Sequence, residues 1–147
     1  MKITIAKDAG YCFGVRDAVN IAYDSAEKHG DVYMLGSIVH NEKVVNDLKN
    51  AGTKIVKSLD DVPKESPILF RAHGTVPKLW DEAKEKKMKI IDATCPLVYE
   101  IHQEVKKLAK DGRKIIVVGD HGHDEVIAIA NQVENAIVIS SPQEAIK

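Results

Sequence analysis

The segment VYMLGSIVHNEKVVNDLKNAGTKIV, residues 32–56, predicts the fold of this protein. It begins with the apolar run Val32–Leu35, passes through a glycine turn, and continues into Glu42–Asn50, where apolar residues recur at helical spacing. A second apolar run, Lys54–Val56, follows after Gly52. Short, almost continuously apolar runs are typical of strands buried on both faces of a sheet. The segment therefore predicts a strand, a helix and a second strand parallel to the first.

The same alternation extends over the rest of the chain. Further strands are predicted at Ile3–Ala6, Ile68–Phe70, Lys89–Ile91, Lys114–Val118 and Ala136–Ile139. Further helices are predicted at Val15–Lys28, Pro77–Lys87, Pro96–Lys110 and Glu125–Val133. We therefore expect an α/β fold with small, mostly parallel sheets flanked by helices.

Two of these helices have a distinct apolar face. The first carries Val15, Val19, Ala22 and Ala26 on one side, and the helix at 96–110 carries Val98, Ile101, Val105 and Leu108. Lys and Glu occupy the opposite side of the second helix. We expect both apolar faces to point into the core.

A weak internal repeat relates the two ends of the chain. Residues of the same type recur 83 positions apart, in the pairs Cys12 and Cys95, Gly36 and Gly119, His40 and His123, and Glu42 and Glu125. This predicts two related lobes: residues 1–94, with an N-terminal strand and the Cys12 turn, and residues 95–147. The second copy stops before the elements that positions 65–95 supply in the first, so we expect a truncated second lobe and a third cysteine beyond the end. The alternative is a chance likeness between two α/β units.

Composition excludes several classes of protein. The chain has 147 residues, of which 44% are hydrophobic and 29% charged, with a net charge of −1 and no basic stripe of the kind that nucleic-acid binding needs. It lacks an apolar run of about 18 residues that would span a membrane. The start, Met1–Asp8, lacks the apolar core of a secretory signal. We expect a cytoplasmic protein.

The two cysteines each stand where a helix is predicted to begin. Cys12 lies in a glycine-flanked turn, and Cys95 precedes Pro96, a residue suited to the first helical position. Helix N-termini stabilise anions, and thiolates are the form that iron and other soft metals bind. Both cysteines are therefore candidate metal ligands. The alternative is that each is a small buried apolar residue.

Three histidines, His40, His73 and His123, each follow an apolar strand and precede a turn or helix. Ligands of open α/β sheets gather beyond the carboxyl ends of the strands. Three imidazoles there can jointly hold an anionic group, such as a diphosphate, by ring N–H donation and by charge when protonated. The alternative for each is a structural histidine. By contrast, we expect His29 and His102 to be solvated and His121 to be a loop residue.

Two kinds of charged residue accompany these histidines. Glu125 lies two residues after His123, where a carboxyl group beside an anion and a metal can donate protons. Glu42 has the matching place in the first copy, but capping explains it equally well. Arg71 is either a phosphate ligand or a salt-bridge residue.

Standard nucleotide and dithiol motifs are missing from the sequence. It contains neither Gly-x-Gly-x-x-Gly nor Gly-x-x-x-x-Gly-Lys-Ser/Thr, so neither common nucleotide loop is supported. It also lacks Cys-x-x-Cys, which argues against a thioredoxin-type site or a zinc ribbon.

Five motifs in order resemble those of the LytB/IspH family, the 4-hydroxy-3-methylbut-2-enyl diphosphate reductases. They are AGYCFGV (9–15), IVHN (38–41), RAHG (71–74), DATCP (92–96) and GHDEV (122–126). The resemblance implies three α/β lobes around a [4Fe–4S] cluster held by three cysteines, of which Cys12 and Cys95 match the first two. It implies that His40, His73 and His123 bind the substrate's diphosphate and alcohol, and that Glu125 relays protons.

The resemblance also implies an activity. Family members remove the allylic hydroxyl of their substrate with two electrons, usually from a ferredoxin or flavodoxin, giving isopentenyl and dimethylallyl diphosphate in the non-mevalonate pathway of isoprenoid biosynthesis. Loss of hydroxide needs a Lewis acid at the oxygen and an acid that protonates it.

This chain departs from the family pattern in three respects. The third cysteine and the polar residues of later family segments are missing, and Asp124 stands where the family usually has proline. We therefore expect the chain to be inactive alone and its truncated lobe to associate through exposed apolar edges. Two alternatives stay open: a cluster-free module that binds diphosphate or a partner, and a half-protein completed by another chain.

Overall fold

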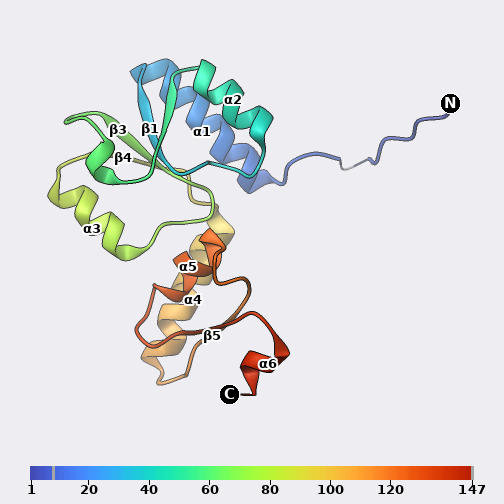
Figure 1. The fold of residues 1–147 in the computed structure, drawn as a ribbon, viewed down its shortest axis with the longest axis vertical. Coiled ribbons are helices and arrows are strands. Elements are labelled where there is room, and N and C mark those ends of the chain that lie inside the picture. The colour runs from blue at the N-terminus through green and yellow to red at the C-terminus, as the bar shows by residue number, and fades with distance from the viewer. Residues whose placement is uncertain (8, 147) are drawn as a thin grey trace.

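The computed structural model describes residues 1–7 and 9–146. Its helices are α1 (Phe13–His29), α2 (Glu42–Asn50), α3 (Pro77–Glu85), α4 (Pro96–Lys110), α5 (Asp124–Ala130) and α6 (Pro142–Ala145), with a 3₁₀ turn, η1 (Leu59–Asp61). Its strands are β1 (Val32–Leu35), β2 (Thr53–Val56), β3 (Pro67–Phe70), β4 (Lys89–Asp92), β5 (Ile116–Val118) and β6 (Ile137–Ile139). Figure 1 shows two sheet-containing parts, with α4 leading from the first into the second.

The first part is built on a sheet with the strand order β2-β1-β3-β4. All three strand pairings are parallel, and in register Val32 pairs with Thr53 and Phe70 with Asp92. All four residues of β3 are buried, as expected for an inner strand covered on both faces. The predicted α/β fold with a parallel sheet is confirmed.

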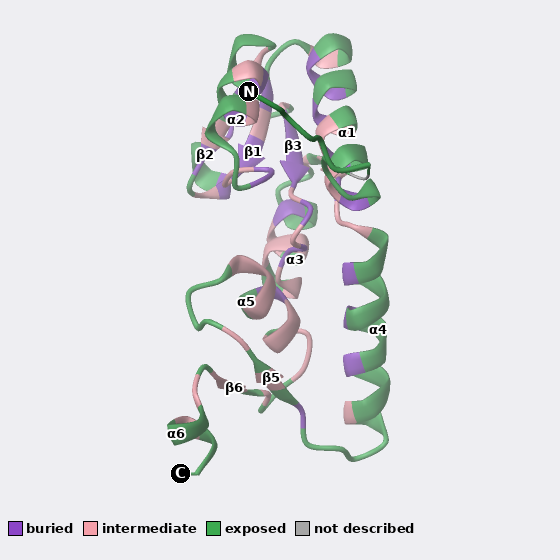
Figure 2. Cartoon of the chain, turned by 90° about the vertical axis from the view of Figure 1, so that its right-hand side faces the viewer, coloured by how far each residue is buried: buried purple, intermediate pink, exposed green. Residues whose placement is uncertain are grey.

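Helices cover both faces of this sheet and form two separate cores. Because successive strand residues point to opposite faces, Met34 packs with Ala22 and Leu48 beneath α1 and α2. On the other face, Phe70 packs with Ala83 and the neighbouring residues of α3 and η1. Figure 2 shows how strongly burial concentrates in this part of the molecule.

The second part has a much smaller core. Here β5 and β6 form a two-stranded parallel sheet, in which Ile116 pairs with Ile137. The side chains of Ile116, Val118 and Ile137 are 58%, 77% and 51% exposed. Burial is confined mainly to α4, α5 and the residue before β5, which leaves much apolar surface uncovered (Figure 2).

The two amphipathic helices differ in how well the sequence predicted their buried sides. In α1, Ala22 and Ala26 are buried as predicted. In α4, however, Ile101 and Leu108 are 41% and 36% exposed, whereas His102, predicted to be solvated, is only 4% exposed. The inward side of α4 thus runs along Val98, His102 and Val105, because Gly74 leaves room there for the imidazole. None of the helices in the described part of the chain is long and apolar enough to cross a bilayer.

The predicted N-terminal strand at Ile3–Ala6 is wrong. These residues belong to neither a strand nor a helix, and Ile3 and Ile5 are 73% and 80% exposed. A strand needs a neighbour to satisfy its backbone groups, and none of the strands in the described residues pairs with this segment. Figure 1 shows it extending away from the first sheet.

The structure repeats itself at the period found in the sequence. The order α1, β1, α2, β2, η1 in the first part recurs as α4, β5, α5, β6, α6 in the second. Gly36 N–H donates to the Val56 carbonyl and Gly119 N–H to the Ile139 carbonyl, so equivalent turns close on equivalent strands. Together with the cysteine and histidine pairs, these bonds support the interpretation of two related units over chance likeness.

Candidate functional site

His40, His73 and His123 come together in the structure, and we call them the histidine triad. The ring centroids of His40 and His73 lie 4.7 Å apart, those of His40 and His123 5.7 Å, and those of His73 and His123 5.8 Å. His40 lies in the segment between β1 and α2, His73 follows β3, and His123 is the N-cap of α5. Residues far apart in the sequence thus meet where strand ends and a helix N-terminus converge.

His73 is the least exposed member of the triad. Its Nδ1 is buried and has no hydrogen-bond partner among the residues that the structure describes. Burial lowers the pKa of His73, and the neighbouring His40 and Arg71 lower it further, against a smaller opposing effect of Asp124. The lowered pKa favours the neutral ring while no ligand is bound, and the unpartnered Nδ1 leaves one polar atom free for a ligand.

Arg71 forms an ion pair that the sequence did not identify. Its Nη1 and Nη2 donate to the two carboxylate oxygens of Asp124 at 2.5 and 2.9 Å. The two residues are 53 positions apart and come from different parts of the molecule. Of the two roles considered for Arg71, the structure thus supports the salt bridge.

The two cysteines lie at helix N-termini, as expected from the turns around them. Cys12 is the N-cap of α1 and Cys95 the N-cap of α4, and neither forms a disulfide. A Cβ atom at Gly14 would overlap with Sγ of Cys95, so this thiol lies against the first turn of α1, two residues after Cys12. The two helix ends that carry the cysteines therefore meet.

A backbone hydrogen bond connects this region to the histidine triad. The Cys95 N–H donates to the carbonyl of Ala72, the residue between Arg71 and His73, at 3.0 Å. Thiol donors at helix N-termini, beside a position that must be glycine, fit part of a soft-metal site. Two thiols fall short of a complete ligand set, and no group of three or more potential ligands is found within residues 1–7 and 9–146.

Glu125 is the second residue of α5 and is partly buried. Its negative charge acts on His102 of α4, where it opposes the lowering of that histidine's pKa by burial and by Lys106. Glu125 is thus two residues from the triad member His123 and close enough to His102 for their charges to interact. Glu42 is exposed at the start of α2, where Asn41 provides the cap by accepting from the Val44 N–H.

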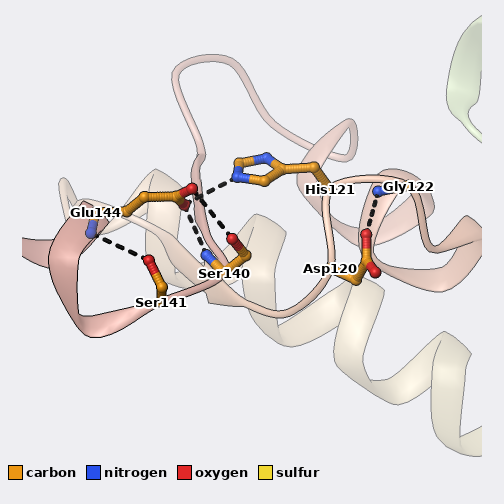
Figure 3. A network of polar contacts seen from close by, with 6 residues as sticks. All are labelled: Asp120, His121, Gly122, Ser140, Ser141 and Glu144. Atoms are coloured by element: carbon orange, nitrogen blue, oxygen red, sulfur yellow. Dashed lines mark hydrogen bonds and ion pairs between the residues drawn. The ribbon is translucent and has the colours of Figure 1, made fainter.

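His121 is separate from the triad. Its Nε2 lies 2.9 Å from Oε2 of Glu144 in α6, which also accepts from the backbone N–H of Ser140 (Figure 3). The Ser140 N–H and then His121 hold the pKa of Glu144 below its usual value. The prediction of a loop residue away from the site agrees with this position.

Comparison with known proteins identifies the family. The family model described as LytB protein matches residues 3–147. The chain belongs to the LytB family. A 4-hydroxy-3-methylbut-2-enyl diphosphate reductase of Clostridioides difficile (strain 630) is 42% identical over 140 residues, which are 95% of this chain and 50% of the relative. The enzyme of the same name from Geobacter metallireducens is 38% identical over 146 residues, 99% of this chain and 51% of the relative.

Two solved LytB-family structures share the fold. The E-1-hydroxy-2-methyl-but-2-enyl-4-diphosphate reductase from Plasmodium falciparum superimposes with a TM-score of 0.90 at 32% identity, over 96% of this chain and 45% of that one. A structure of (E)-4-hydroxy-3-methyl-but-2-enyl diphosphate reductase gives 0.83 at 35% identity, over 97% and 52%. The chain spans about half the length of the curated relatives it matches.

The positions of two residues near the histidine triad were not predicted from the sequence. Asp124 was noted only as a departure from the family pattern, although an acidic residue next to a candidate histidine is a natural partner for a candidate arginine. His102 was assigned to solvent because charged residues surround it in the sequence. Gly74 was the available signal, since the missing side chain of this glycine makes the space that His102 fills.

Proposed function

We propose that this chain supplies the first two cysteine ligands, the diphosphate-binding histidines and the proton-donating carboxyl group of a 4-hydroxy-3-methylbut-2-enyl diphosphate reductase. The observation that carries the proposal is the convergence of the histidine triad beside the turn that holds Cys95. The names of the LytB-family relatives supply the substrate. The reaction removes the allylic hydroxyl and gives isopentenyl and dimethylallyl diphosphate.

In this proposal the histidine triad binds the diphosphate. Imidazole rings within 6 Å of one another can donate several N–H groups to one anion, and a nearby dianionic group favours their protonated form. His123 is also the N-cap residue of α5, where its side chain makes no capping hydrogen bond and so stays available for the anion. Held at this end, the substrate has its hydroxyl oriented toward the cysteine side of the site, which lowers the entropic cost of reaction.

The cysteines and Glu125 act at the other end of the substrate. Cys12 and Cys95 would hold a [4Fe–4S] cluster together with a third thiolate, and such a cluster supplies electrons and Lewis acidity when bound. Glu125, on the helix that His123 caps, holds the proton that the departing hydroxyl requires. We further propose a cytoplasmic location, a ferredoxin or flavodoxin as electron donor, and association through the uncovered apolar residues of β5 and β6.

Diphosphate binding by the triad is testable on this chain directly. His73→Gln removes the chargeable ring and should weaken the affinity for inorganic diphosphate about tenfold or more, the scale of a lost charged hydrogen bond. Isothermal titration calorimetry measures the change. His121→Gln is the matched control, because His121 pairs with Glu144 outside the triad. Equal affinities of both variants would remove the triad from the proposal.

Cluster binding separates the proposal from its alternatives. After anaerobic incubation with iron and sulfide, the chain with a C-terminal extension that supplies a third cysteine should become coloured, and its iron content should fall in Cys12→Ser and Cys95→Ser. A colourless chain that still binds diphosphate would support the cluster-free module. Colour that develops only with a second polypeptide carrying another cysteine would support the half-protein.

A further inference from the structure

We propose that the Arg71–Asp124 ion pair is a latch between the two parts of the molecule, and that it positions His123 against His40 and His73. This inference takes one thing from the proposed function, namely that the histidine triad binds diphosphate. Arg71 and Asp124 are positioning residues in it: they act on the anion through the triad and do not bind it.

The pair is the single salt bridge that joins the two parts in the described portion of the chain. Arg71 follows β3 of the first sheet, and Asp124 is the first residue of α5 in the second part. Both terminal guanidinium nitrogens, Nη1 and Nη2, are engaged, which fixes orientation as well as distance. The side chains are only 24% and 31% exposed, so the contact is less screened than a surface pair.

Arg71 and Asp124 are each close in sequence to a member of the histidine triad. Asp124 is bonded to His123, and Arg71 is two residues before His73 in a turn that the Gly74 N–H closes on the Arg71 carbonyl at 3.1 Å. In this proposal the pair thereby holds the His73 and His123 rings at their separation of 5.8 Å between centroids. If the two parts separate, the triad loses the member contributed by the second part.

The first part is shaped to receive the Arg71 side chain. Gly36 has a φ of +78°, and a Cβ atom there would lie 2.6 Å from Nη1 of Arg71. The Arg71 guanidinium thus lies over Gly36 and contacts Asp124, whose carboxylate neutralises its charge. An anion arriving at the triad meets an arginine that a carboxylate already occupies in bidentate fashion, so the histidines are the remaining donors.

The latch and direct phosphate binding by Arg71 predict opposite effects of Asp124→Asn. If Arg71 binds the anion, this substitution frees the guanidinium and removes a negative charge, so affinity for inorganic diphosphate rises. If the pair is a latch, the substitution opens the molecule and affinity falls. A population that is about one-tenth closed weakens the apparent affinity about tenfold.

The experiment combines calorimetry with a distance measurement on the full chain. Nitroxide labels at exposed Lys49 in α2 and Asn131 after α5, attached through a ketone-bearing unnatural residue, leave both native cysteines intact. Pulsed electron resonance then gives the distance distribution between the two parts. We expect Asp124→Asn and Arg71→Gln to broaden it, and the double swap Arg71→Asp with Asp124→Arg to narrow it again. The control, Asp47→Asn, removes an ion pair within α2 and should leave the distribution unchanged.

The distance measurement and the calorimetry test the latch and the proposed function separately. A distribution unaffected by Asp124→Asn and Arg71→Gln, or tighter diphosphate binding by Asp124→Asn, would overturn the latch. Failure of the unsubstituted chain to bind inorganic diphosphate would instead overturn the proposed function, while the distance distributions would still decide whether the pair holds the two parts together.

Discussion

At the scale of single residues, His73 has the environment of an anion-responsive group. Burial, His40 and Arg71 lower its pKa, so the ring is mostly neutral near pH 7 when no ligand is bound. An anion beside the ring favours the imidazolium, and binding should therefore raise the pKa and take up a proton. The contribution of His73 to diphosphate affinity should therefore increase as the pH falls from 8 toward 6.

Proton uptake on binding is measurable. Titrations of inorganic diphosphate at pH 7 in buffers with different ionisation enthalpies should give apparent enthalpies that differ in proportion to the protons taken up. In His73→Gln the apparent binding enthalpy should depend less on the buffer. Protons taken up by diphosphate itself contribute equally to both proteins, so the difference between the proteins reports on His73. Identical buffer dependence of both proteins would exclude His73 as the group that gains the proton.

At the scale of elements, α4 is distinguished by the side it buries. His102 lies inward, its Nε2 is without a partner in the described residues, and burial lowers its pKa. The folded chain thus binds fewer protons at His102 and His73 than the unfolded chain does. Stability from both groups is present above the unfolded pKa of about 6.5 and is lost progressively as the pH falls from there through the lower pKa of the folded state.

Replacement of His102 tests this account. His102→Leu keeps an apolar volume and removes an unsatisfied buried nitrogen, so the free energy of unfolding at pH 7.5 should rise by about 1 kcal/mol. Between pH 7.5 and 5.5, the free energy of unfolding of His102→Leu should also fall less than that of the unsubstituted chain. Gln103→Leu, at the exposed neighbouring position of α4, is the control because it removes no titratable group. Urea denaturation at both pH values measures these free energies. If His102→Leu has the same pH dependence of stability as the unsubstituted chain, His102 is not a source of that dependence.

At the scale of the whole molecule, the two parts differ in how completely they cover their sheets. The first sheet is covered by helices on both faces, whereas β5 and β6 expose Ile116, Val118 and Ile137. Exposed apolar strands of this kind promote association. We therefore expect the chain to self-associate through the second part.

A charge on the exposed strand should reduce this association. Val118→Lys places an ammonium group on the most exposed of the three side chains and should shift the molecular mass measured by light scattering toward that of the monomer. Lys54→Gln, at the exposed edge strand β2, is the control. Equal masses for the unsubstituted chain and Val118→Lys at every concentration would place the association elsewhere.

Local patterns in the sequence determined most of the order of the elements and the placement of the candidate site residues at strand and helix ends. Runs such as Val32–Leu35 and the helix spacing of Glu42–Asn50 depend only on near neighbours, and both were predicted with the bounds that the structure has. The placement of Cys12 and Cys95 at helix starts also follows from local turns, and so does that of the three histidines near strand ends.

Tertiary structure alone decided how these local pieces face one another. The rotation of α4 that buries His102 and exposes Ile101 depends on the space above Gly74, and Ile3–Ala6 lacks a strand because no described strand lies beside it. The Arg71–Asp124 pair joins residues 53 positions apart. Such contacts depend on the packing of whole elements, which the helical and strand periods of a sequence do not encode.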